Sequence, residues 1–330
     1  MTTIPAGQVH EHEQRAALAA LTYAADFPDR RLIGLLTTLS PANVVAVIKT
    51  GGLHDGAEMP EIAAGYLSAA AGTLARWRRR LQDAPADGGL GAAARHGFRL
   101  VCPGEPGWPI SLYDLGPDRP CALWAKGADL PQPDTAVAVT GSRAATAYGM
   151  RIAAQIAADL AECDTPVVSG GAPGIDLAAH RAALACGGTT VAVVPSGPGA
   201  ACGGTHAGLL EAIASSGGTV VTEQPPGQPA TRLRYVRRGR LITALSSGVV
   251  LVEASPHGTA IRIARDAASL GKPLMAVPGR VASVQSAGCH RLIRAGAALV
   301  TSAEEVRSTI TACQQRRLGT PVFSRFSGPG

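Results

Sequence analysis

Aromatic residues make up only 4% of the 330 residues, which limits the ways in which this chain could bind a ligand. A surface that binds nucleic acid by stacking its bases needs several exposed rings. Between residues 132 and 312 the only aromatic residues are Tyr148 and Tyr235. A nucleic acid bound there should therefore be held chiefly through its phosphates, with little preference for sequence.

Paired cysteines and metal-ligand clusters are missing as well. The cysteines stand singly, without a C-x-x-C pair, and their number is odd, which is typical of reduced thiols in the cytosol. Cys289 and His290 are adjacent but lack further ligands, so we expect no metal site. The seven cysteines are Cys102, Cys121, Cys163, Cys186, Cys202, Cys289 and Cys313.

No apolar run reaches the length of a membrane span, and the polar N-terminus has no hydrophobic leader segment. We therefore expect a cytoplasmic protein. Its formal charge of +6 suits a polyanionic partner, but basic proteins without such a partner are common. Charge alone leaves nucleic-acid binding open.

The pattern of apolar residues predicts two domains and a tail. Residues 14–82 have helical periodicity, with Ser40 and Pro41 as a start signal and Gly51 as a stop signal. We therefore predict a small all-α domain with a linker over residues 1–95. Residues 96–312 alternate between Val-rich runs and helical stretches, and residues 313–330 are expected to be disordered.

The alternation predicts a doubly wound, mostly parallel α/β sheet of Rossmann-like type, because nearly all-apolar strands need helices on both faces. In such sheets, ligands bind beyond the carboxyl ends of the strands. The predicted strands are 136–140, 166–169, 190–194, 219–222, 249–252, 273–277 and 298–300, and the predicted helices are about 147–162, 174–187, 206–216, 232–245, 259–270 and 287–295.

The first of these strands ends in a candidate anion site. Gly141 allows a sharp turn, Ser142 offers a hydroxyl and Arg143 a guanidinium, all at the start of a helix. The alternative is an ordinary strand–turn–helix with an exposed arginine. Gly258 and Thr259 form a similar small turn before a later helix.

The second strand ends in a glycine-rich loop, Ser169-Gly170-Gly171-Ala172-Pro173-Gly174, that lets a ligand approach the backbone. Its spacing fits neither a dinucleotide fingerprint nor a Walker loop, so we expect no nucleotide cofactor. Asp176 and His180 follow this loop, with no second carboxylate or nucleophile beside them. We interpret both as structural clamps rather than acid–base catalysts.

An arginine-rich segment over residues 232–240 carries five arginines and no acidic residue. On a helix Arg234, Arg237 and Arg238 can share one face, whereas Arg240 cannot join all of them. A solvated helix face is the simpler alternative, but such a face usually mixes charges of both signs. The segment therefore favours binding of a polyphosphate.

Taken together, these motifs resemble the DNA-processing protein A family, also called DprA or Smf. The resemblance covers about 200 residues, from PGEPGWPISLYDLG through AVAVTGSRAATAYG, VVSGGAPGIDLAAH and RYVRRGRLITALSSGVVLVEA to SAGCHRLIRAGAALV. It implies an extended Rossmann fold that binds single-stranded DNA without base preference, forms a homodimer and loads the recombinase RecA during natural transformation. No catalysis and no cofactor are implied.

Residues that match the family's motifs are implied to contact DNA phosphates. These are Ser142, Arg143, Gly170, Gly171, Gly174, Arg237, Arg238 and Arg240. We expect the same role for residues beside them or in similar turns, namely Gly141, Tyr148, Gly149, Ser169, Arg234, Gly258 and Thr259. The chain departs from the pattern at Pro173, Gly239 and His290. We also expect a form without the C-terminal winged-helix domain of many relatives.

Other functions on a similar sheet stay open. A phosphoribohydrolase-type enzyme would carry a Pro-Gly-Gly-x-Gly-Thr loop with a nearby glutamate, which residues 202–206 echo only in part. A nucleotide sensor without catalysis is a further alternative, and a dehydrogenase is disfavoured because its fingerprint is absent.

Overall fold

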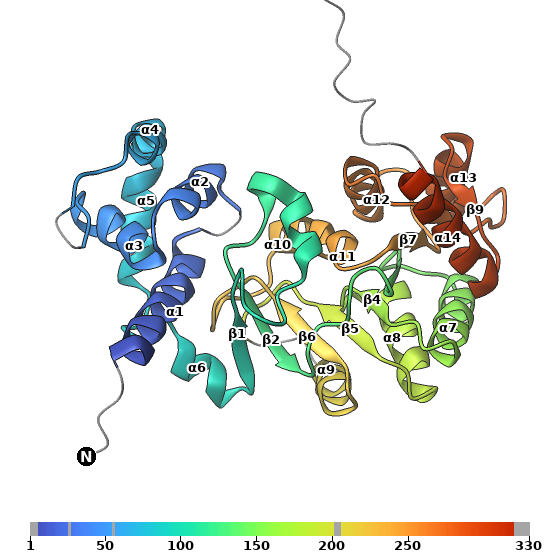
Figure 1. Ribbon diagram of the computed structural model, residues 1–330. Coiled ribbons are helices and arrows are strands. Elements are labelled where there is room, and N and C mark those ends of the chain that lie inside the picture. The colour runs from blue at the N-terminus through green and yellow to red at the C-terminus, as the bar shows by residue number, and fades with distance from the viewer. Residues whose placement is uncertain (1–5, 26–27, 55–56, 201–205, 320–330) are drawn as a thin grey trace, which may run out of the picture. The chain divides into compact units, whose positions relative to one another are not determined.

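The computed structural model describes residues 6–25, 28–54, 57–200 and 206–319. The chain forms two compact units (Figure 1). The first unit comprises residues 1–132 and 190–244, and the second comprises residues 133–189 and 245–330. Each unit contains part of the α/β sheet with its flanking helices.

Six helices among the described residues open the first unit, and local signals in the sequence set several of their ends. Asp29 caps one helix by accepting a hydrogen bond from Arg31 N at 3.0 Å. The predicted start at Ser40 and stop at Gly51 are both confirmed, and Gly51 has φ +88°. The helices are α1 (Ala6–Ala24), α2 (Arg30–Thr38), α3 (Pro41–Thr50), α4 (Glu61–Ala69), α5 (Ala71–Gln82) and α6 (Leu90–Arg95).

The sheet of the first unit has the strand order β1-β2-β6-β5. The pairs β1–β2 and β2–β6 are antiparallel, whereas β5 and β6 are parallel. Both β1 and β2 lie outside the strands predicted from the sequence. The elements are β1 (Phe98–Val101), the 3-10 segment η1 (Ile110–Asp118), β2 (Leu123–Gly127), β5 (Thr190–Val193), α9 (His206–Ser215), β6 (Thr219–Thr222), α10 (Arg232–Arg237) and α11 (Gly239–Ala244).

One apolar core joins the N-terminal helices to these strands. Leu21 of α1 and Trp77 of α5 belong to the same buried cluster as Leu100 of β1 and Trp124 of β2. The predicted domain boundary at residue 95 therefore does not coincide with the limits of a compact unit. Part of the predicted linker is helical, as α6 occupies Leu90–Arg95.

The second unit contains five parallel strands in the order β4-β3-β7-β8-β9. Valines of β3 and β7 pack against Ile156 and Leu160 of α7 in one buried core. The elements are β3 (Val137–Thr140), α7 (Ala147–Glu162), β4 (Val167–Ser169), α8 (Ile175–Ala185), β7 (Gly248–Leu251), α12 (Ala260–Ser269), β8 (Leu274–Ala276), α13 (Val284–Arg294), β9 (Ala298–Leu299) and α14 (Ala303–Gly319).

The predicted Rossmann-like α/β fold with preceding helices is confirmed. All seven predicted strands are present, with ends that differ by at most one residue. The helix expected at 232–245 is instead two short helices, which meet at Arg238, and α13 begins three residues earlier than expected. A disordered tail is predicted from residue 313 onward, but α14 continues to Gly319. Residues 320–330 lie outside the described part of the chain. None of the described helices has the length and apolar character that a membrane crossing requires.

The shared core makes a specific prediction about stability. Trp77 is 1% exposed, so Trp77→Ala should lower the free energy of unfolding by about 3–5 kcal/mol through lost burial and a new cavity. Urea denaturation followed by circular dichroism measures this change. The adjacent exposed substitution Arg76→Ala should change the stability by less than about 0.5 kcal/mol. Equal effects of the two substitutions would contradict the burial of Trp77 in the shared core.

Candidate nucleic-acid interface

The sheet of the second unit contains a point at which the chain reverses its direction of winding. From β3 the next strand along the chain, β4, lies on one side, and β7 lies on the other. Loops that follow two such neighbouring strands diverge, and ligands of doubly wound sheets bind at this switch point. The candidate residues that follow β3, β4 and β7 therefore lie at or next to this switch point.

The loop after β3 is held by hydrogen bonds along its length. Ser142 N donates to the carbonyl of Glu253 at 2.7 Å, which ties the loop to the end of β7. The Ser142 hydroxyl donates to Gln285 Oε1 at 2.8 Å and accepts from Ala144 N at 3.2 Å. Arg143 lies between these fixed points and is exposed. The fixed loop thus presents a guanidinium to solvent just before the start of α7.

A buried carboxylate sets the start of α7. Glu253 is 1% exposed, and its two oxygens accept hydrogen bonds from Thr146 N at 2.8 Å and from Thr146 Oγ1 at 2.6 Å. Thr146 Oγ1 in turn accepts from Gly149 N at 3.1 Å and so caps the helix. A side-chain carbon at Gly149 would overlap the Glu253 carboxyl group. The negative charge is therefore engaged inside the protein rather than facing a bound anion.

The glycine loop after β4 lies directly against the loop after β3. Gly174 has φ +83°, and a side-chain carbon there would overlap the Ser142 carbonyl. Ile175 N donates to that same carbonyl at 3.3 Å. Only glycine satisfies both the backbone conformation and the close approach. The structure thus brings together two loops that the sequence presented as separate motifs.

Asp176 and His180 lie inside the fold beneath these loops. The Asp176 carboxylate accepts a hydrogen bond from Thr140 Oγ1 at 2.6 Å and another from Ala172 N at 3.2 Å. These two bonds connect the end of β3 to the loop after β4, and His180 is fully buried one helical turn later. Such contacts suit the structural role that we predict for both residues.

Other candidate positions of the second unit differ in how far solvent can reach them. Ser169 and Gly170 are buried, and the Ser169 hydroxyl donates to Val139 O at 2.7 Å. Tyr148 is exposed, donates its hydroxyl hydrogen to Pro278 O at 2.9 Å and has a guanidinium 5.8 Å from its ring centroid. Thr259 is exposed just before α12, and Gly258 and Gly171 are partly exposed. Phosphate contact at these positions stays a prediction.

Two of the three departures from the family pattern also lie in this unit. Pro173 is exposed in the glycine loop, where it can offer no backbone N–H to a phosphate. The Nε2 atom of His290 lies 3.2 Å from Gly279 N and 3.1 Å from Gly279 O, so this ring holds the loop after β8.

The arginine-rich segment belongs to the first unit, and three of its four candidate guanidiniums are buried. Arg240 donates to Glu223 at 2.9 and 2.5 Å, to Asp118 O at 2.8 Å and to Arg237 O at 3.0 Å. Arg238 donates to Val193 O at 2.9 Å, at the end of β5. The same sequence pattern therefore serves to connect helices, strands and loops of the first unit.

Arg234 completes this set of internal contacts. Its guanidinium donates to Pro229 O at 2.5 Å and to Gln228 Oε1 at 2.8 Å. By contrast, Arg237 is exposed at the end of α10, and Gly239 is buried at the start of α11. Of the four arginines, Arg237 has the exposure that a direct phosphate contact needs, and contacts by the other three stay predictions.

Aromatic rings take part in this region to a greater extent than the sequence suggests. The guanidinium of Arg238 lies 4.8 Å from the ring centroid of Tyr235, which is partly exposed. A guanidinium stacked over a ring gives a favourable cation–π contact. Tyr235 is not among the site residues predicted from the sequence, because aromatic residues are scarce. Its position within the arginine-rich segment is the sequence feature that indicates this contact.

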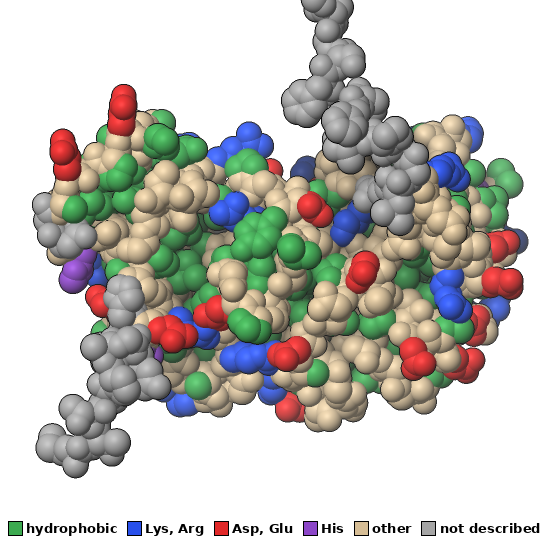
Figure 2. All heavy atoms as spheres, in the orientation of Figure 1, with side chains coloured by type: hydrophobic (Ala, Val, Ile, Leu, Met, Phe, Trp, Pro, Cys, Tyr) green, Lys and Arg blue, Asp and Glu red, His purple; other side chains and the backbone are tan. Residues whose placement is uncertain are grey.

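The face shown in Figure 2 carries basic and acidic side chains interspersed rather than one field of positive charge. Binding of a polyanion depends more on local groups, such as Arg143 and Arg237, than on net charge. Arg143 belongs to the second unit and Arg237 to the first.

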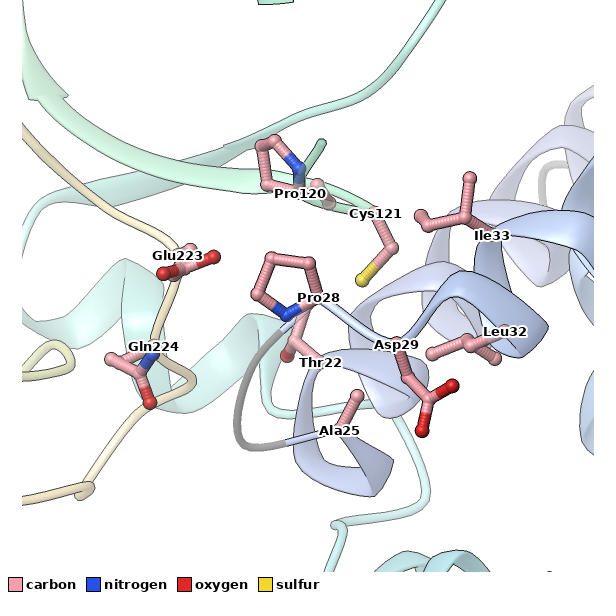
Figure 3. Close-up of a pocket in the computed structure, with 11 residues that line it drawn as sticks. Thr22, Ala25, Pro28, Asp29, Leu32, Ile33, Pro120, Cys121, Glu223 and Gln224 are labelled. Carbon is pink, nitrogen blue, oxygen red and sulfur yellow. The ribbon is translucent and has the colours of Figure 1, made fainter. Parts of the chain in front are cut away.

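A cavity of about 20 Å³ lies in the first unit, which is room for one water molecule (Figure 3). It is lined by residues from α1 and α2, from the start of β2 and from the end of β6, including Cys121 and Glu223. Burial raises the pKa of the Cys121 thiol to about 12, so this thiol stays protonated and unreactive at neutral pH. Glu223, which lines the cavity, also forms the ion pair with Arg240.

Among the described residues, no group of three or more His, Cys, Asp or Glu side chains is placed to hold a metal ion. The segment 202–206, which echoes a phosphoribohydrolase loop, lies almost entirely outside the described residues.

The family model for DNA recombination-mediator protein A matches residues 99–311. The chain belongs to this family. The match includes the switch point with its loops and also the arginine-rich segment. Both groups of candidate residues thus lie within the part of the chain that the family model matches.

Curated relatives agree with this membership. A DNA processing protein DprA of Mycobacterium tuberculosis is 45% identical over 240 residues, which is 69% of this chain and 61% of the relative. The Smf protein of Escherichia coli is 37% identical over 189 residues, which is 57% of this chain and 50% of the relative. The chain thus spans between half and three fifths of the length of these two relatives.

Solved structures show the same fold. The DprA structure from Streptococcus pneumoniae aligns with a TM-score of 0.67 at 24% identity, covering 93% of this chain and 98% of that one. The DprA structure from Helicobacter pylori aligns with a TM-score of 0.57 at 25% identity, covering 66% of this chain and 96% of that one. The latter is described for its single-stranded DNA binding mode.

Glu253 provides a first test of the loop geometry. In Glu253→Gln an amide replaces one acceptor of the Thr146 hydrogen bonds, so stability should fall by about 1–3 kcal/mol. Urea denaturation measures the change, and Glu162→Gln at the exposed end of α7 is the control. Unchanged stability of the Glu253 variant would show that the carboxylate does not hold Thr146.

The ion pair of Arg240 with Glu223 provides a second test. The two side chains are 8% and 11% exposed, so Arg240→Met leaves a largely buried carboxylate without its partner. The free energy of unfolding should fall by about 3–5 kcal/mol, which chemical denaturation measures. The control Arg237→Met removes a nearby exposed guanidinium and should cost far less. If the two variants were equally stable, the structural role of Arg240 would be excluded.

Proposed function

We propose that this chain binds single-stranded DNA through backbone phosphates, without base preference and without catalysing a reaction. In this proposal the strand contacts the joined loops after β3 and β4 of the second unit, and Arg237 of the first unit is a separate candidate contact. The bound strand is then passed to a recombinase of the RecA type during DNA uptake and recombination.

The observation that supports the proposal most directly is the geometry around Arg143. The loop that carries it is fixed on both sides, by Ser142 and by Gly174, and it leads into the N-terminus of α7. Helix N-termini favour anions, and an exposed arginine on a fixed loop can add charge-assisted hydrogen bonds. The Glu253 carboxylate is buried and hydrogen-bonded to Thr146, so it is not on the surface that a phosphate would approach.

The comparisons support the choice of ligand. The chain shares its family with the DprA proteins, and the H. pylori member is described as binding single-stranded DNA. Transfer to RecA, homodimer formation, a cytoplasmic location and a role in natural transformation are further parts of the proposal, and they rest on family membership alone.

Arg143→Gln should weaken binding to an oligo(dT) of about 30 nucleotides at low salt, because one phosphate contact is lost. The slope of log K against log salt concentration should become shallower by about 0.7. Fluorescence anisotropy of a labelled oligonucleotide measures both quantities. The loss should be equal for oligo(dT), oligo(dC) and oligo(dA), since phosphates carry no sequence.

The matched control is Arg307→Gln, an exposed arginine of α14, which should leave binding unchanged. NAD and ATP are titrated in parallel. Tight binding of either nucleotide, with no binding of the oligonucleotide, would overturn the proposal in favour of a nucleotide-binding protein.

A further inference from the structure

The 3-10 segment η1 of the first unit presents apolar and aromatic side chains to solvent. Ile110 is 76% exposed and Tyr113 is 41% exposed, although both precede a buried strand by only a short stretch of chain. Trp108, at 8% exposure, lies under this surface. A group of large apolar side chains that are exposed to solvent often marks a binding surface.

The Tyr113 ring is held in a defined position. The ring of Trp108 meets it edge to face, with centroids 6.3 Å apart and an angle of 60° between the planes. The guanidinium of Arg119 lies 5.5 Å from the Tyr113 ring centroid. A ring fixed by an aromatic neighbour and a guanidinium loses little conformational entropy when a ligand stacks on it. We refer to Ile110, Tyr113 and Arg119 as the Tyr113 platform.

Buried hydrogen bonds fix this platform beside the arginine-rich segment. The guanidinium of Arg240 donates both to Asp118 O at 2.8 Å and to Arg237 O at 3.0 Å, so the same side chain holds these two carbonyl groups. At the other end of η1, Ser111 Oγ donates to Ala244 O at 2.6 Å. Arg119 follows Asp118 directly, so the backbone of Arg237 lies close to the end of η1 that leads into the platform.

The charges around the platform suit a polyanion. Arg30 Nη2 lies 3.6 Å from Asp118 Oδ2, so the charge of this carboxylate is offset. With Arg30 and Asp118 offsetting each other, Arg119 and Arg237 are the remaining basic residues, against the exposed acidic Asp114 of η1. A surface with an exposed ring and a basic rim has the two features that bind a single strand: a stacking surface for bases and positive charge for phosphates.

We propose that the Tyr113 platform is a stacking site for nucleobases of the bound single strand. This inference rests on the proposed function, because it assigns a second contact to the same strand. In it, a base stacks on Tyr113 beside Arg119 while Arg237 contacts a neighbouring phosphate. Stacking accepts any base, so the platform adds affinity without adding sequence specificity.

An abasic oligonucleotide separates stacking from phosphate contacts. Tyr113→Ala should weaken binding of oligo(dT) roughly tenfold and leave binding of an abasic strand of equal length unchanged. The salt dependence of oligo(dT) binding should stay the same, because no phosphate contact is removed. Tyr113→Phe keeps the ring and should retain wild-type affinity. The control is Ile62→Ala, which removes an exposed apolar side chain from α4, away from the platform.

Photo-crosslinking gives an independent readout. An oligonucleotide with 5-iodouracil, irradiated in complex with the full chain, should form a crosslink at Tyr113 that mass spectrometry can map. No crosslink there, together with unchanged oligo(dT) binding by Tyr113→Ala, would overturn the stacking site while wild-type binding still supports the proposed function. If the wild-type chain binds neither the oligo(dT) nor the abasic strand, the proposed function itself fails, and the stacking site with it.

Discussion

The candidate site depends on the buried carboxylate of Glu253. It is buried just after β7, and it accepts both the backbone N–H and the hydroxyl of Thr146 before α7 begins. These bonds join the loop after β7 to the loop after β3. They therefore help to position Arg143, although Arg143 itself does not take part in them. Burial of this charge is tolerable because both of its oxygens are engaged.

The arginine-rich segment shows how one charge pattern can serve two purposes. A run of basic residues without acids suggests a surface for polyanions, yet Arg234, Arg238 and Arg240 donate to carbonyl and carboxylate oxygens within the first unit. Arginine suits such positions because its planar fork can satisfy several acceptors at once. The internal contacts hold α10 and α11 in place, and Arg240 and Ala244 of α11 join this segment to η1.

Much of the fold could be predicted from the sequence because the parallel strands are short, Val-rich and bounded by glycine or polar turns. Strands β1 and β2 could not be found in this way, since each carries a basic residue among its apolar ones. For the candidate site, the turn motifs located the loops, and Asp176 could be placed beneath them. Which arginines are buried depends on tertiary contacts with Glu223, Val193 and Gln228, and no local pattern encodes these.

The core shared by the N-terminal helices and strands β1 and β2 has a consequence for how this chain can change. Trp77 and Trp124 belong to one buried cluster, so neither side retains a complete apolar interior without the other. Loss or exchange of the helices would leave Leu100 and Trp124 in water and remove the support of the sheet's antiparallel margin. The helices are thus a structural requirement of the first unit, and the sheet should not be transplanted into another protein without them.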